Sequence, residues 1–226
     1  MKTKARSIHQ IVEDQVQKWN RLHSDKVATK PGIPIVTLSR EPGSGGKLVA
    51  KGIAEALGFD LFHQEVIHEM AQSARVGTRL LETLDEKGLS VLEDWIRSLI
   101  RERHLWPDEY AQHLMKVIAT IGKHGRAVLV GRGANFVLPA ENRFRVRVIA
   151  SEDFRVANVA HTFGIDAKEA RRRVIRTESD RKAFIRKYFN ADISNPLNYD
   201  VVLNTETVSI EAAVAGITQI LTKRFG

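Results

Sequence analysis

Residues 43–47 form a glycine-rich segment that ends in a lysine, Gly-Ser-Gly-Gly-Lys. Glycines let consecutive backbone N–H groups turn toward one point and bind an anion, and a following lysine can contact nucleotide phosphates. A tight turn also needs glycine for its positive φ angles, so the segment alone is weak support for phosphate binding. The residues expected to bind a nucleotide are Gly43, Ser44, Gly45, Gly46, Lys47 and Leu48.

The sequence on either side of this segment favours phosphate binding. Residues 35–38 are a short, mostly β-branched run that suits a buried strand, and residues 49–57 have helical periodicity. Gly58 then ends the helical pattern, as glycine commonly does at a helix C-terminus. A strand, a glycine-rich turn and a helix form the context that a phosphate-binding loop requires.

The match to the usual pattern G-x-x-x-x-G-K-[ST] is incomplete. Glu41 occupies the first glycine position, and Leu48 occupies the position of the hydroxyl that normally contacts Mg²⁺. Ser44, or a carboxylate acting through water, would have to replace that contact. The sequence therefore leaves the metal ligands unidentified.

A second functional candidate is Arg132, which lies between Gly131 and Gly133 directly after the strand-like run 127–130. Glycines at a strand end allow a ligand to approach the backbone closely. This arrangement favours a substrate contact for Arg132. The alternative is a strand-end arginine that pairs with a surface carboxylate.

Residues 171–187 carry a dense group of arginines. Arg172 and Arg176 are four residues apart and share one helix face, and Arg181 and Arg186 follow them. The planar guanidinium group suits bidentate contacts with phosphate. A solvated basic helix face is the commoner role of such a run, but beside a phosphate-binding loop we interpret it as a phosphate-binding cluster.

Carboxylates within and before this stretch predict its local structure. Asp166 and Glu169 form a capping pattern at the start of the helix, and we expect a break near residues 177–179. Clustered arginines repel one another unless anions or carboxylates relieve the repulsion. We therefore expect Glu178 and Asp180 to hold the arginines when no ligand is bound.

The formal net charge of +8 is distributed unevenly over the chain. Residues 1–32 carry +4, residues 33–170 are neutral, residues 171–187 carry +6 and residues 188–226 carry −2. A concentrated patch suits a compact polyanion such as a nucleoside triphosphate. Nucleic-acid-binding proteins more often spread basic residues over a whole face, so direct nucleic-acid binding is disfavoured.

The composition is that of a globular protein, with 226 residues of which 43% are hydrophobic and 27% charged. The chain contains no cysteine, which excludes disulfides, thiolate zinc sites and cysteine nucleophiles. Its start lacks the apolar core of a signal peptide, and no apolar run approaches the roughly 18 residues that span a bilayer. We expect a cytoplasmic protein without a membrane-spanning segment.

The hydrophobic pattern predicts an α/β fold. Strand-like runs at residues 35–38, 127–130, 144–149 and 199–203 are separated by helical stretches, the longest at residues 61–125. Strands connected in this way form a parallel β-sheet with helices on its faces.

An amphipathic helix is predicted at residues 5–22, ahead of a break at residues 30–32. Its apolar stripe either packs on its own domain or contacts a partner or a second copy of the chain. We divide the chain into this N-terminal helix at residues 1–30 and one domain at residues 33–226.

Four segments resemble the cytidylate kinase-like family, a bacterial branch of the P-loop nucleoside monophosphate kinases. The resemblance covers roughly residues 33–222 and leaves the N-terminal helix outside. The segments are Ser-Arg-Glu-Pro-Gly-Ser-Gly-Gly-Lys at 39–47, Val-Gly-Arg-Gly-Ala at 130–134, Arg-Lys-Ala-Phe-Ile-Arg-Lys-Tyr-Phe at 181–189 and Asn-Pro-Leu-Asn-Tyr-Asp-Val-Val-Leu-Asn-Thr at 195–205.

The resemblance implies a P-loop NTPase fold with a helical acceptor-side insert at residues 61–125 and an arginine-rich lid at residues 171–198. It implies ATP and Mg²⁺ as cofactors, with Arg132 on the phosphate of the acceptor. The residues that it suggests for catalysis are Lys47, Arg132, Arg176, Arg181 and Arg186, and those for substrate binding are Arg132, Arg172 and Asp180.

The expected function is ATP-dependent phosphoryl transfer to a nucleoside monophosphate, most simply CMP or dCMP. The insert does not align residue by residue with ordinary cytidylate kinases, so the base specificity does not carry over. One alternative is a kinase for another phosphorylated or hydroxylated metabolite. The other is a non-catalytic ATP-binding regulator that signals through residues 1–30.

Overall fold

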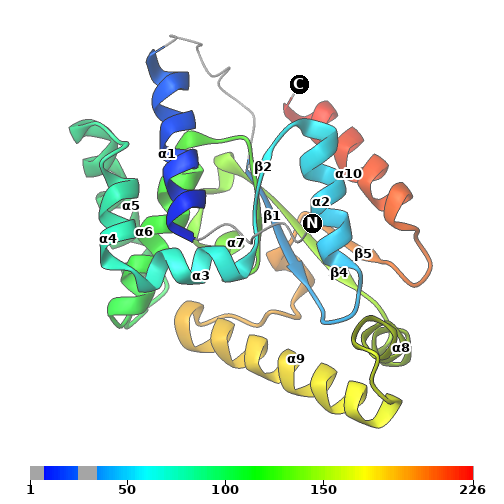
Figure 1. Ribbon diagram of the computed structural model, residues 1–226. Coiled ribbons are helices and arrows are strands. Elements are labelled where there is room, and N and C mark those ends of the chain that lie inside the picture. The colour runs from blue at the N-terminus through cyan, green and yellow to red at the C-terminus, as the bar shows by residue number, and fades with distance from the viewer. Residues whose placement is uncertain (1–7, 25–34, 226) are drawn as a thin grey trace.

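The structure, a computed structural model, describes residues 8–24 and 35–225. Five parallel strands form a central sheet in the order β2-β3-β1-β4-β5 (Figure 1). The strands are β1 (Ile35–Arg40), β2 (Asp60–Phe62), β3 (Ala127–Val130), β4 (Arg143–Ile149) and β5 (Val201–Asn204).

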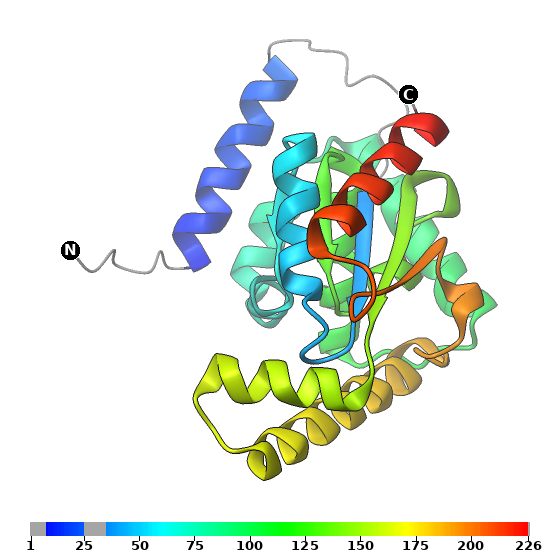
Figure 2. The same ribbon diagram turned by 90° about the vertical axis from the view of Figure 1, so that its right-hand side faces the viewer.

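Helices cover both faces of this sheet (Figures 1 and 2). α2 and α10 lie side by side on one face, and α6 and α7 lie toward the other, with α3, α4 and α5 beyond them. The helices are α1 (Ile8–Ser24), α2 (Gly46–Leu57), α3 (Gln64–Gln72), α4 (Ala74–Leu81), α5 (Glu86–Glu102), α6 (Glu109–His124), α7 (Ala134–Val137), α8 (Glu152–Phe163), α9 (Ala167–Phe189) and α10 (Ile210–Phe225), with short 3₁₀ helices at Ala140–Asn142 and Pro196–Asn198.

The residues of β4 show how the sequence separates the two faces. Phe144, Val146 and Val148 belong to the core beneath α2 and α10. Arg145 and Arg147 alternate with them and therefore lie on the opposite face, because successive side chains of a strand point in opposite directions. One face of β4 thus builds the core, while the other carries charged groups, of which Arg147 lies toward the carboxyl end and pairs with Glu41.

The N-terminal helix α1 packs against α3 and α4 of its own chain. Val12, Val16 and Trp19 are buried, and the Trp19 ring stacks on His124 with centroids 3.8 Å apart. Lys18 also pairs with Asp60 at the start of β2, at 2.6 Å. The described part of the apolar stripe is therefore covered within the chain, while residues 1–7 and 25–34 lie outside the described structure.

Helices α8 and α9 form a hairpin across the carboxyl end of the sheet (Figures 1 and 2). Asp166 caps α9 by accepting a hydrogen bond from the Glu169 amide at 2.8 Å, as the capping pattern predicts. The predicted break at residues 177–179 is wrong, because α9 runs without interruption through this region. On either side of that region, buried Val174 packs against α8 and buried Ile185 belongs to the main core.

The parallel sheet with flanking helices confirms the predicted α/β fold, and all four predicted strands are present. The strand β2, however, was not predicted. It pairs with β3 over only three residues, too few to show an alternating pattern in the sequence. No helix in residues 8–24 or 35–225 combines the length and low charge needed to cross a membrane.

Candidate active site

The glycine-rich loop joins the end of β1 to the start of α2 and adopts the strained backbone that glycine permits. Gly43 has φ +82° and Gly45 has φ +74°, in the region that other residues rarely adopt. A Cβ atom on Gly43 would lie 2.4 Å from the carbonyl oxygen of Arg155 in α8. Glycine at position 43 is therefore required both for the loop's turn and for the close approach of α8.

Ser44 and Leu48 do not form a preformed magnesium site. The Ser44 hydroxyl is buried and donates to the carbonyl oxygen of Glu41 at 2.9 Å, so it holds the loop together. Leu48 is 59% exposed and has no oxygen to offer. Across residues 8–24 and 35–225, no three histidine or carboxylate side chains gather as metal ligands. Among the described residues, the side chains thus form no preassembled Mg²⁺ site of their own.

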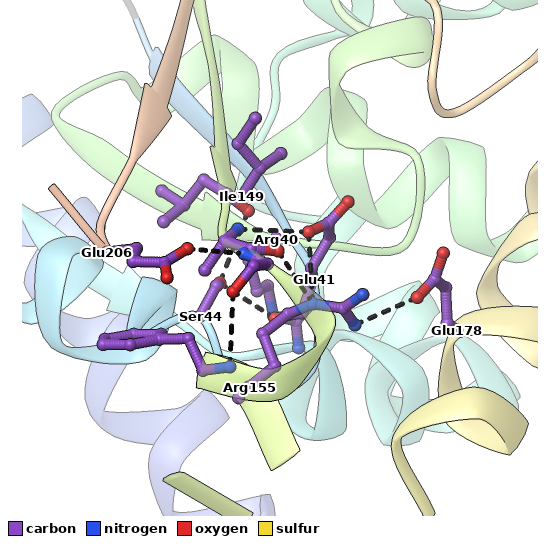
Figure 3. Close-up of polar contacts among 12 residues, drawn as sticks. Arg40, Glu41, Ser44, Ile149, Arg155, Glu178 and Glu206 are labelled. Atoms are coloured by element: carbon purple, nitrogen blue, oxygen red, sulfur yellow. Dashed lines mark hydrogen bonds and ion pairs between the residues drawn. The ribbon is translucent and has the colours of Figure 1, made fainter. Parts of the chain in front are cut away.

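Glu41, which replaces the usual first glycine, connects the loop to β4 and to the α8–α9 hairpin (Figure 3). Its carboxylate lies 3.3 Å from Arg147 and 3.4 Å from Arg155, and both arginines are buried. Arg155 extends to Glu178 of α9 at 3.0 Å. Glu178 also pairs with Lys182 at 2.6 Å. Glu178 thus pairs with Arg155 and Lys182, and within residues 8–24 and 35–225 no ion pair joins it to the arginines predicted to contact phosphate.

Lys47 lies in the first turn of α2 and pairs with Glu65 of α3 at 3.3 Å. Burial alone would raise the pKa of the Glu65 carboxyl, but its own backbone amide and the charge of Lys47 together lower it below its usual value. Glu65 therefore remains an anion at neutral pH beside the lysine of the loop.

A cavity of about 410 Å³ opens beside the loop, at the carboxyl ends of β1 and β3. Arg132 and Arg181 both line it, and Asp180 lies beside them. Arg132 has φ +53°, and its guanidinium carbon lies 5.1 Å from the centre of the Phe184 ring. Arg181 donates to the carbonyl oxygen of Arg40 at 2.8 Å. The fold thus brings these two predicted arginines together at one cavity.

Two further residues of this cavity were not expected from the sequence. Arg40 is the last residue of β1 and is 5% exposed. Asn135 is the second residue of α7 and is buried as well. Both carry buried nitrogen atoms without a hydrogen-bond partner in the described chain. Arg40 is part of the segment that resembles the kinase family. The neighbouring residues in the sequence, however, do not distinguish a ligand-binding arginine from a structural one at the end of a strand.

The other predicted arginines of α9 lie outside this cavity. Arg172 is exposed and pairs with Glu169 on the same helix at 2.5 Å. Arg176 and Arg186 are exposed on α9, and neither lines the cavity. Their phosphate contacts therefore stay predictions.

A second cavity, of about 560 Å³, shares Arg132 and Phe184 with the first. It lies between α9 and the helices of the 61–125 segment, and it is lined by rings and polar groups. His68 and Tyr110 lie in its wall, joined by a 2.8 Å contact between Nδ1 and the hydroxyl. The two cavities therefore place an aromatic surface next to a cationic one.

The comparison with known protein families decides the classification. The model of the cytidylate kinase-like family matches residues 35–207, from the start of β1 past the end of β5. The chain belongs to the cytidylate kinase-like family. As a member of this family, it is a phosphotransferase of the nucleoside monophosphate kinase type, with a P-loop fold.

Individual relatives of this cytidylate kinase-like protein agree with the family match. The cytidylate kinase of Ignicoccus hospitalis is 24% identical over 189 residues, which cover 84% of this chain and 99% of that protein. The cytidylate kinase of Archaeoglobus fulgidus is 27% identical over 190 residues, which cover 83% and 92%. An uncharacterized protein from Eubacterium ventriosum has a similar crystal structure, with a TM-score of 0.67, 24% identity and coverage of 85% and 99%.

Proposed function

We propose that this protein transfers the γ-phosphoryl group of ATP to the phosphate of a nucleoside monophosphate, with CMP or dCMP as the first acceptors to test. One observation carries the proposal: the cavity lined by Arg132 and Arg181 lies beside the loop that ends in Lys47. The lysine of the loop and the arginines of the adjoining cavity would each neutralise one of two phosphate groups that approach each other. ATP would arrive as its magnesium complex, in which the phosphates supply ligands to the ion.

Phosphoryl transfer asks the protein mainly to position the reactants and to neutralise phosphate charge. An oxygen of the acceptor phosphate attacks the γ-phosphorus, a new P–O bond forms, and the bond to the β–γ bridging oxygen breaks, so ADP leaves. No general base is needed, because the attacking oxygen is already ionised. Lys47 would neutralise the donor phosphates, Arg132 would orient the acceptor, and Arg181 would bridge the transferring group.

The α8–α9 hairpin is the part of the fold that would close over both nucleotides. It includes residues 171–189 of the predicted lid and adds α8, which contacts the loop at Gly43 and pairs with Glu41. Arg176 and Arg186 are exposed in this structure, so they would reach phosphate after a movement of the hairpin. Arg172 and Asp180 would contact the substrate from the same helix.

The aromatic cavity would receive the nucleoside of the acceptor. It shares Arg132 with the cationic cavity, so one acceptor would place its phosphate in the first cavity and its base in the second. Gln72 and Glu109, which line its wall, provide amide and carboxylate groups that can hydrogen-bond to a base. CMP and dCMP are the first acceptors to test because the relatives described above carry the name cytidylate kinase.

A coupled assay of ADP release across CMP, dCMP, UMP, AMP and GMP tests the proposal. We expect turnover with CMP or dCMP and a large loss of rate in Lys47→Ala and Arg132→Ala. Turnover only with another metabolite would show that the protein is a kinase for that metabolite instead. ATP binding without turnover, unchanged in Lys47→Ala, would favour a non-catalytic regulator instead.

A further inference from the structure

We propose that Arg40 binds the phosphate group of the acceptor and makes the cavity selective for phosphorylated over merely hydroxylated acceptors. The inference rests on the proposed function, because it assigns the acceptor's phosphate to the cavity beside the loop. It adds a residue that lies between the glycine-rich loop at residues 43–47, here called the donor loop, and the turn at residues 131–133, here called the acceptor loop.

The first support is that Arg40 is a buried cation without a counter-ion. It is 5% exposed, and its Nε and Nη2 atoms have no hydrogen-bond partner among the described residues. A buried charge that is not paired is strongly unfavourable, so such groups are normally held by a carboxylate or a ligand. No ion pair to Arg40 is present within the described chain. A bound anion would complete this site.

The neighbouring charges increase this unfavourable energy. Burial, followed by the charge of Arg181, lowers the pKa of Arg40 to about 9. This pKa already includes an opposing increase from the charge of Glu65 and a smaller decrease from the charge of Arg132. A group with this pKa is still protonated at neutral pH. Three cations thus face one cavity, and a phosphate dianion would relieve their mutual repulsion.

The polar groups around the cavity are chiefly donors. Asn135 is buried with its amide nitrogen unpartnered, and the Nε atom of Arg132 is buried and unpartnered as well. Asp180 is the single carboxylate among the described residues that line the cavity. Hydrogen bonds from charged donors to phosphate oxygens are about twice as strong as hydrogen bonds between neutral groups. A neutral hydroxyl would leave most of these donors unsatisfied, and a polar site rejects ligands that do so.

Glycines on both sides leave room for the Arg40 side chain. A Cβ atom on Gly131 would lie 2.5 Å from the Nη1 atom of Arg40. A Cβ atom on Gly46 would lie 2.5 Å from the Cβ atom of Arg40. Gly46 begins α2 and Gly131 follows β3, so Arg40 is enclosed by the donor loop and the acceptor loop together. Both glycine motifs thereby contribute to the placement of one guanidinium group.

Arg40→Met tests the proposal, with Arg143→Met as the matched control. Arg143 also has a buried, unpartnered Nε atom and a pKa lowered by burial, but it lies at the start of β4 and does not line the cavity. Melting temperature is followed while inorganic phosphate is titrated at constant ionic strength, with saturating AMP-PNP to fill the donor loop. Initial rates then give KM for CMP and for ATP separately.

We expect phosphate to raise the melting temperature of the wild type and of Arg143→Met but not of Arg40→Met. In Arg40→Met, KM for CMP should rise about 30-fold or more, because removing a buried charged contact with a ligand causes a large loss of affinity. KM for ATP should stay within about 3-fold, since the donor loop is intact. Without ligand, Arg40→Met should be as stable as the wild type or more stable, because replacing an unpaired buried charge is often stabilising.

A phosphate response and an unchanged KM for CMP in Arg40→Met would overturn the proposal. Arg40→Lys keeps the charge without the planar fork, and it should give an intermediate KM if Arg40→Met does not fold. An Arg40-dependent phosphate response without any CMP turnover would retain this site and reject the proposed function. Turnover of CMP that does not depend on Arg40 would do the reverse.

Discussion

The amino group of Lys47 lies 3.3 Å from the carboxylate of Glu65, so the lysine of the glycine-rich loop already faces an anion supplied by α3. Both side chains are more than half exposed. An ion pair of this kind stabilises a protein by less than about 1 kcal/mol, because water screens the charges. Nucleotide phosphates can therefore replace Glu65 as the partner of the Lys47 amino group at little cost in stability.

Glu65→Gln should strengthen ATP binding. Removal of the competing carboxylate should lower the Kd for ATP about 2- to 5-fold, the range that corresponds to an exposed ion pair. Isothermal titration calorimetry measures this change directly. Glu55→Gln is the control, because Glu55 pairs with Lys51 on the exposed side of α2. Weaker ATP binding in Glu65→Gln would show that the carboxylate instead contributes to the bound state.

Glu41→Gln should destabilise the protein by about 3 kcal/mol. The substitution leaves the buried guanidinium groups of Arg147 and Arg155 without their shared carboxylate, and breaking a buried pair is strongly unfavourable. Urea unfolding at pH 7 measures the loss. The exposed pair between Glu152 and Arg171 offers a control, since Glu152→Gln should change stability by less than about 1 kcal/mol. Equal effects of the two substitutions would contradict the role of Glu41.

Asp200 should contribute stability that disappears in acid. Burial alone would raise the pKa of the Asp200 carboxyl, but the hydrogen bonds and charge of Arg145, and the charge of Arg224, lower it below the usual value. A carboxyl whose pKa is lower in the folded state stabilises the protein fully above the unfolded pKa of about 3.9. This stabilisation is lost as pH falls through the folded pKa.

Asp200→Asn should therefore lower the free energy of unfolding by about 1–2 kcal/mol at pH 7, a value reduced by partial solvent screening. The difference from the wild type should shrink when urea unfolding is repeated toward pH 3. Asp94→Asn serves as the control, because Asp94 forms an exposed pair with Arg97. A difference that persists unchanged in acid would rule out the ionised carboxylate as its source.

Trp19→Ala should destabilise the protein by about 3–5 kcal/mol, as is usual for a large buried aromatic residue. The same experiment on exposed Gln17→Ala should give a change within about 0.5 kcal/mol. Chemical unfolding followed by circular dichroism distinguishes the two variants. If both behave like the wild type, α1 does not pack on the domain, and its apolar stripe is free for a partner or a second copy.

Local patterns in the sequence were enough to predict most of the sheet and the glycine-rich turn between β1 and α2. β3 is a continuous apolar run, β1 begins with a mostly β-branched one, and glycines follow both strands, so strands and turns were readable from a few neighbouring residues. Parallel pairing then places the ends of both strands at one edge. The position of Arg132 at the cavity follows from that topology alone.

The rest depends on contacts between distant segments. Arg40 is significant because Gly131, far along the chain, encloses its side chain. Glu41 looked like a departure from the loop pattern, but its partners Arg147 and Arg155 come from β4 and α8. The prediction of a break in α9 at residues 177–179 was wrong because Glu178, within this stretch, is held by an ion pair with Arg155 of α8. Helix propensity and the spacing of residues along the sequence do not reveal these pairings between distant segments.

The most direct test of the account is the identity and amount of the products formed from ATP and CMP. Chromatographic separation of the nucleotides should show ADP and CDP in equal amounts with the wild type. Lys47→Ala should form both at least about 100-fold more slowly, because the donor phosphates lose their neutralising charge. Formation of ADP without CDP, or no product from any nucleoside monophosphate by a folded protein that binds ATP, would contradict the proposed transfer.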